Sequence, residues 1–175
     1  MRRTEVATVA VFTAMIVGSD LALATVPNVK LLDSLVFVVA FVYGFRTGAL
    51  VAILSEGVWA VVSPWGFAAV IAPFLIVGEL VFAVAGWQAS RVWGDPSKLI
   101  SNSLFIGATI LLCAFAWDLE TNVATAFIAS GPGLVATLVS GIPFAIIHEV
   151  SDFIIGAALA PAVILLIPRI ESKVR

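Results

Sequence analysis

Three ionisable side chains lie close together near the middle of an otherwise apolar stretch. His148, Glu149 and Asp152 interrupt residues 134–168, which are mostly Leu, Val, Ile, Ala and Phe. Residues three and four apart lie on the same face of a helix, so we expect the three side chains to share one face. An ionisable group deep in a bilayer costs at least ~2.5 kcal/mol, and this face is therefore expected to line a protein interior or a cavity.

The composition indicates the class of protein that must position these groups. Hydrophobic residues make up 62% of the 175 residues, charged residues 11%, and the mean hydropathy is +1.16. Soluble domains contain about 45–50% apolar and about 25% charged residues, so the sequence predicts an integral membrane protein. The alternation of polar and apolar residues that is typical of barrel strands does not persist over enough residues to suggest a barrel. The expected fold class is therefore all-α. The net charge of −2 and the lack of basic patches with interleaved aromatics predict no nucleic-acid partner.

Turn residues divide the chain into apolar segments. We predict a single transmembrane domain, residues 1–175, built as a bundle of six transmembrane helices. The second segment is short, and the fifth and sixth are long enough to span a bilayer of ~30 Å with length to spare. The predicted spans are approximately 5–26, 31–43, 49–62, 67–92, 98–128 and 134–167.

Basic residues predict the orientation of this bundle. With six spans, eight of the nine Lys and Arg residues fall on one side of the membrane, and Lys30 alone falls on the other. Short cytoplasmic loops carry the excess of Lys and Arg, so both termini are expected to be cytoplasmic. The expected location is the cell (plasma) membrane, with a multi-pass topology.

With this orientation, most embedded acidic residues lie between the middle of the membrane and its outer surface. Asp20, Asp33 and Glu56 lie in the outer parts of the first three spans, and Glu79 lies near the middle of the fourth. A pore or a proton relay would place polar groups across the full thickness. The asymmetry therefore favours a polar cavity that opens to the outside.

Several stretches resemble the S-components of energy-coupling factor (ECF) transporters, which are their substrate-binding membrane subunits. Residues 26–31 and 43–49 resemble the first outer loop and the inner turn of many S-components. Residues 118–126 resemble the end of the fifth span, and residues 141–153 resemble the sixth-span signature. Six short spans with both ends in the cytoplasm match the layout of that family.

This resemblance implies a subunit that binds a vitamin or related micronutrient, has no enzymatic activity and needs no cofactor. In this family the substrate enters a pocket near the outer face, and the subunit docks on a transmembrane coupling protein driven by two cytoplasmic ATPase subunits. Reorientation in the lipid membrane then delivers the substrate inward. Docking uses small residues of the first span, which let helices approach closely in lipid; the matching positions are Ala7, Ala10 and Ala14.

The candidate substrate contacts are embedded polar groups and residues near the outer capping loops. They are Asn28, Glu56, Trp59, Trp65, Glu79, Asp118, His148, Glu149 and Asp152. Many carboxylates, few basic groups and several tryptophans favour a ring-bearing small molecule that is cationic or rich in hydrogen-bond donors. Each candidate also has a simpler structural role, because embedded carboxylates can pair with neighbouring helices and tryptophans can form an interfacial belt.

Two other functions are compatible with the sequence. One is a small structural membrane subunit of a larger complex, in which the embedded carboxylates serve helix contacts. The other is an autonomous proton-coupled carrier. We expect no metal site, because His148 is the only histidine and Cys113 the only cysteine. A phosphate-cradling glycine loop is also missing, so no nucleotide hydrolysis is expected from this chain.

Overall fold

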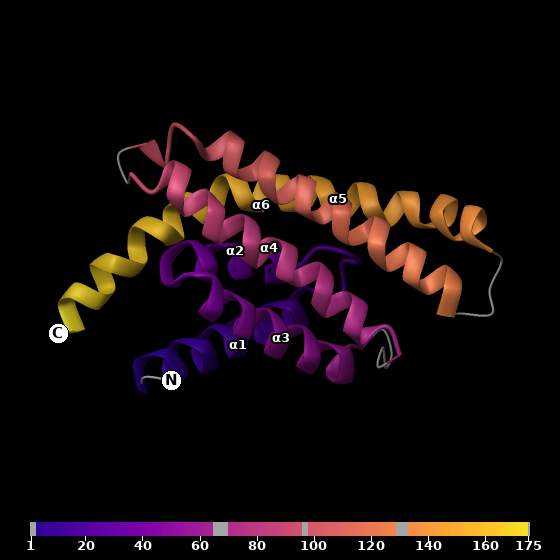
Figure 1. Ribbon diagram of the computed structural model, residues 1–175, viewed down its shortest axis with the longest axis horizontal. Coiled ribbons are helices and arrows are strands. Elements are labelled where there is room, and N and C mark those ends of the chain that lie inside the picture. Colours follow the sequence, from indigo (N-terminus) through magenta and orange to yellow (C-terminus); the bar gives the residue numbers. More distant parts are fainter. Residues whose placement is uncertain (1–2, 65–69, 96–97, 129–132, 175) are drawn as a thin grey trace.

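The computed structural model describes residues 3–64, 70–95, 98–128 and 133–174, with side chains described up to residue 167. Within these ranges the regular secondary structure is helical, which confirms the all-α prediction. Figure 1 shows the arrangement of the helices. They are α1 (Arg3–Leu23), α2 (Leu32–Tyr43), α3 (Phe45–Val62), α4 (Ala72–Trp93), α5 (Ser103–Ile128) and α6 (Leu134–Val174).

Five of these helices are long and apolar enough to cross a membrane, and α2 is the exception. With 12 residues, α2 is about 18 Å long, whereas the hydrocarbon core is about 30 Å thick. The five consecutive residues from Val36 to Ala40 are all buried, because α2 packs against every other helix. The second predicted span, residues 31–43, is therefore a short helix as expected, and it is enclosed by its neighbours.

Local backbone chemistry explains where two helices begin. Gly44 separates α2 from α3 with a φ of 89°, a left-handed conformation that glycine adopts without penalty. This reversal lets α3 begin at Phe45, earlier than the predicted start at residue 49. In contrast, α4 begins at Ala72 and not at residue 67, which places Pro73 in the first helical turn. A proline is tolerated there because N–H groups of the first turn have no partner within the helix, so the missing N–H of proline removes no hydrogen bond.

The helices alternate in direction between the two ends of the bundle. In Figure 1, α1 begins and α6 ends toward the left, whereas α3 and α5 end and α4 and α6 begin toward the right. The longest contact is between α5 and α6, and α2 packs mainly on α4 and α3. The start of α1 and the end of α6 therefore lie at the same end of the bundle.

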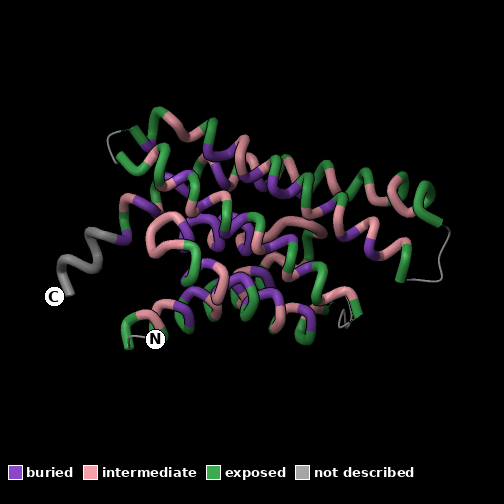
Figure 2. Tube along the Cα trace, in the orientation of Figure 1, coloured by how far each residue is buried: buried purple, intermediate pink, exposed green. Residues whose placement is uncertain are grey.

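The buried stripe of α6 carries both its packing residues and its polar groups. His148, Asp152, Gly156 and Ala160 follow one another at four-residue spacing, and all four are buried. Gly156, which has no side chain, and Ala160, which has a small one, suit close approach of helices in lipid. Asp118 lies on the buried stripe of α5, the helix that packs along α6. Figure 2 shows that buried positions follow the inward sides of the helices.

Candidate functional site

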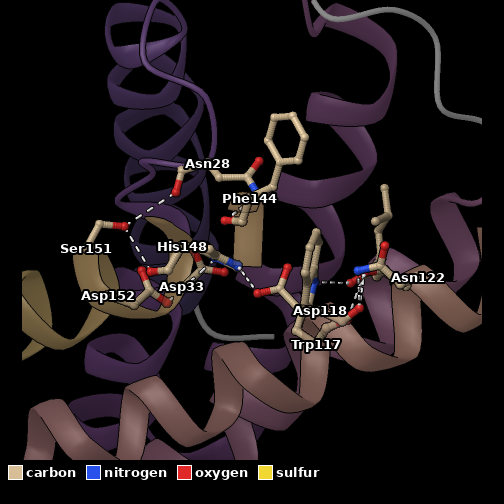
Figure 3. A network of polar contacts seen from close by, with 11 residues as sticks. Asn28, Asp33, Trp117, Asp118, Asn122, Phe144, His148, Ser151 and Asp152 are labelled. Carbon is tan, nitrogen blue, oxygen red and sulfur yellow. Dashed lines mark hydrogen bonds and ion pairs between the residues drawn. The ribbon is translucent and has the colours of Figure 1, made fainter. Parts of the chain in front are cut away.

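Four buried side chains from α2, α5 and α6 meet in what we call the His148 cluster: Asp33, Asp118, His148 and Asp152 (Figure 3). His148 Nδ1 lies 3.0 Å from Asp118 Oδ2, and His148 Nε2 lies 3.4 Å from Asp33 Oδ2. Asp152 Oδ2 lies 3.8 Å from the same Nε2 atom. The imidazole thus joins three helices through polar groups that are hidden from solvent.

Trp117 lies beside the His148 cluster and packs against the His148 ring. Its ring meets the His148 ring edge to face, with centroids 5.3 Å apart, and its Nε1–H donates to the carbonyl oxygen of Leu75 at 3.3 Å. Glycine at position 78 makes room for the indole, because a Cβ atom there would overlap it. A residue of α4 without a side chain therefore sets the position of a tryptophan on α5.

Lys30, in the connection between α1 and α2, lies over the ring of this tryptophan. Its Nζ atom lies 4.3 Å from the centroid of the Trp117 ring, within the range of a cation–π contact. Burial by itself would lower the pKa of Lys30, but the carboxylates of Asp33, Glu56 and Glu79 outweigh it and raise that pKa above its ordinary value. Lys30 is therefore a cation at neutral pH.

A cavity of about 310 Å³ opens next to Lys30 at the end of the bundle where α3 ends and α4 begins. We call it the outer cavity, since this is the end that the basic residues predict to face outward. It lies among the α1–α2 connection, α3, the start of α4 and Trp117 of α5. Its polar and aromatic lining residues include Asp20, Asn28, Lys30, Glu56, Trp59 and Trp117.

Asn28 ties the α1–α2 connection to α6. Its φ of 57° is left-handed, a conformation that asparagine tolerates better than most residues. Its side-chain amide donates to the carbonyl oxygen of Phe144 at 3.2 Å, and its own carbonyl accepts from the Ser151 hydroxyl at 3.4 Å. Asp20 holds the end of the same connection, because its Oδ1 accepts from the Leu31 N–H at 3.0 Å.

The structure distributes the predicted site residues over two layers. Asn28, Glu56 and Trp59 line the outer cavity. Asp118, His148 and Asp152 form the deeper cluster, as the helical spacing of the last two predicted. Three predicted residues remain: Glu79 is buried next to the cluster, Glu149 lies apart from it, and Trp65 is outside the described residues.

Glu79 is fully buried and interacts with Asp33. Glu149, in contrast, is half-buried on a groove between α5 and α6, so it does not share the inward face of His148 and Asp152. Trp65 lies outside the described residues. The grouping of the predicted polar residues is thus partial, with Glu149 turned to one side.

Four residues of the site were not among the predicted contacts: Asp20, Lys30, Asp33 and Trp117. The sequence did carry a signal for Lys30, the single basic residue on the predicted outer side. Asp20 and Asp33 also stood out as embedded carboxylates. Their convergence on Lys30 and His148 depends on helix packing that the linear sequence does not contain.

Buried carboxylates outnumber the cations that they meet. Six are buried in this region, namely Asp20, Asp33, Glu56, Glu79, Asp118 and Asp152. The basic side chains that interact with them are Lys30 and His148. Several carboxylate oxygens have no hydrogen-bond partner, including both oxygens of Glu79 and both of Asp152. Unpaired buried carboxylates are costly, so this region is suited to taking up protons or a cationic group.

Comparison with known proteins yields no relative: no protein-family model, curated protein or solved structure matches this chain.

Proposed function

We propose that this chain is the substrate-binding membrane subunit of an importer of the energy-coupling factor type, and that the outer cavity receives the substrate. The observation that carries the proposal is the cavity itself, about 310 Å³ in volume, with charged groups and tryptophans in its lining. Ligand pockets for small molecules begin at about 300 Å³ and combine apolar walls with a few polar groups. The resemblance of residues 26–31, 118–126 and 141–153 to S-components supports the same function.

The lining favours a vitamin-like molecule with a flat ring. Trp59 and Trp117 offer aromatic surface for stacking, which contributes beyond the area that it buries. Asp20 and Glu56 supply carboxylates that would accept hydrogen bonds from a cationic or donor-rich ring. Lys30 is available for an acidic substituent of the same molecule. A ring compound of mixed polarity fits this lining better than a purely apolar one.

Under this proposal the subunit has no catalytic step. Binding at the outer face is followed by reorientation in the membrane, driven by ATP hydrolysis in two partner subunits through a transmembrane coupling protein. The first helix would supply the docking face, because Ala7, Ala10 and Ala14 are exposed on α1. Small residues at this spacing let a partner helix approach closely.

The test is ligand binding to the purified chain. Native mass spectrometry identifies any small molecule carried through purification, and radiolabelled vitamins are then titrated against the protein in detergent. Glu56→Gln should weaken binding about ten- to a hundredfold, because loss of one buried hydrogen-bond partner costs about 1–3 kcal/mol. Glu120→Gln is the matched control, since Glu120 is a half-buried carboxylate of α5 outside the outer cavity.

Two outcomes would contradict the proposal. If no vitamin is carried or bound while the protein stays folded, the chain is a structural subunit and its carboxylates serve helix contacts. If vesicles that contain this chain alone take up substrate along a proton gradient, without any ATPase, it is an autonomous carrier.

A further inference from the structure

The deeper layer of the site has a second set of atoms arranged for a ligand. Asp33, His148 and Asp152 each offer one donor atom, and these three atoms lie within 4.8 Å of one another. All three side chains are fully buried. We propose that Asp33, His148 and Asp152 form a binding site for one divalent transition-metal ion, separate from the outer cavity and independent of the function proposed above.

The distances suit donor atoms that share an ion. Nε2 of His148 lies 3.4 Å from Asp33 Oδ2 and 3.8 Å from Asp152 Oδ2. Charge-assisted hydrogen bonds between nitrogen and carboxylate are about 2.7–2.9 Å long. Two ligands of a tetrahedral zinc ion with bonds of about 2.0–2.1 Å lie about 3.3 Å apart. The separations on the Nε2 side are thus too long for strong direct bonds, and the 3.4 Å separation from Asp33 is close to that between two ligands of one zinc ion.

The other ring nitrogen is held as metal-binding histidines usually are. Asp118 Oδ2 lies 3.0 Å from His148 Nδ1, an ordinary hydrogen-bond length. A carboxylate that accepts the Nδ1–H fixes the tautomer and leaves the Nε2 lone pair free to bind a metal. Nε2 lies on the side of Asp33 and Asp152 (Figure 3). Asp118 is thereby a positioning residue and not a ligand.

Carboxylate oxygens of Asp33 and Asp152 without a hydrogen-bond partner are an independent indication of a cation site. Both oxygens of Asp152 and Oδ1 of Asp33 lack a hydrogen-bond partner, although both residues are fully buried. Buried charges in proteins are paired or coordinate metals, and a divalent ion would neutralise two of these carboxylates.

The donor set identifies the class of ion. Imidazole and carboxylate together suit Zn²⁺, Co²⁺ or Ni²⁺, whereas Ca²⁺ and Mg²⁺ take oxygen ligands. Three protein ligands leave a fourth position open. The sequence led us to expect no metal because it contains a single histidine, and that expectation did not include Asp33, which comes from α2, 115 residues before His148.

The test uses the full chain, purified in detergent and stripped with a chelator. Zn²⁺ or Co²⁺ alone is added back, and bound metal is measured by elemental analysis together with the visible absorption of Co²⁺. We expect one ion per chain, and a rise in the thermal unfolding temperature on adding Zn²⁺. Asp152→Asn should lower the affinity at least tenfold, and Asp118→Asn about ten- to a hundredfold as a loss of ligand positioning. Glu120→Gln should bind as the unmodified chain does.

The competing arrangement is an imidazolium ion hydrogen-bonded to the carboxylates with no metal present. It predicts no stoichiometric uptake and no effect of Zn²⁺ on thermal unfolding, and this result would overturn the proposal. Equal affinity in Asp152→Asn and in the unmodified chain would overturn it as well. Asp33→Asn provides a second ligand variant, and gel filtration shows whether each variant is folded. No vitamin is added, so a failure here is distinct from a failure of the outer cavity to bind one.

Discussion

Asn28 shows how one residue can secure the rim of the outer cavity. Its backbone is left-handed, its side-chain amide donates to Phe144 and its carbonyl accepts from Ser151. These interactions attach the α1–α2 connection to α6 across 116 residues of sequence. Because Lys30 lies two residues further on, the same interactions also help to position the cation beside Trp117.

Substitutions at this position should separate the backbone contribution from the side-chain contribution. Asn28→Ala loses the amide and places an ordinary side chain at positive φ, which together should destabilise the chain by about 2 kcal/mol. Asn28→Gly keeps the left-handed conformation and loses only the amide, so about half of that loss is expected. Thermal unfolding in detergent measures both. Equal unfolding temperatures for Asn28→Ala and the unmodified chain would show that the connection is not held in this way.

At the scale of helices, α2 and α4 approach each other closely, and this determines where Asp33 and Glu79 lie. A Cβ atom at Gly86 of α4 would overlap the carbonyl group of Phe37 in α2. Backbone atoms cannot move aside as a flexible side chain can, so this contact depends on glycine. The short and fully enclosed α2 is possible only because its neighbours come this near.

We therefore expect Gly86→Ala to be strongly destabilising, by about 1–3 kcal/mol, because it overpacks the α2–α4 contact. Gly18→Ala is the matched control: it is the same change within a helix, at an exposed position where a Cβ would meet no atom within 4 Å. Alanine is a better helix former than glycine, so the control should unfold at the same or a higher temperature. If both variants unfold at the same temperature, Gly86 is not in close contact with the Phe37 carbonyl group.

For the whole molecule, the ends of the bundle differ in charge. Among the residues that the structure describes, Arg3, Arg46, Arg91 and Lys98 lie toward the end where α1 begins and α6 ends, and the outer cavity with Lys30 lies at the opposite end. The bias of basic residues toward the cytoplasm predicts that the cavity faces outward. The direction in which a substrate would enter depends on this orientation.

Single cysteines can test the orientation in intact cells. In a Cys113→Ala background, Thr25→Cys should react with a membrane-impermeant maleimide, whereas Lys98→Cys should react only after the cells are opened. Both positions are exposed and lie at opposite ends of the bundle, and Cys113 is buried. The reverse labelling pattern would place the cavity on the cytoplasmic side and would contradict capture of a substrate from outside.

The sequence alone was sufficient for the features that depend on composition and local spacing. Apolar content predicts a membrane protein, apolar runs predict the long helices, and four-residue spacing predicts that His148 and Asp152 share a buried face. The long apolar helices and the shared buried face are confirmed, because helical periodicity and exclusion of charge from lipid act over a few neighbouring residues. Helix length does not follow in the same way, as α2 shows, because a segment enclosed by other helices need not match the thickness of the bilayer.

Only the tertiary structure decided which distant groups meet. Asp33 and His148 lie 115 residues apart, and their contact requires α2 to be inserted between the other helices. Glu149 adjoins His148 in sequence but turns toward a groove, because one residue along a helix rotates a side chain by about 100°. Trp117 reaches its place because Gly78 on another helix has no side chain. Contacts of this kind follow from close packing between helices, which no local pattern in the sequence contains.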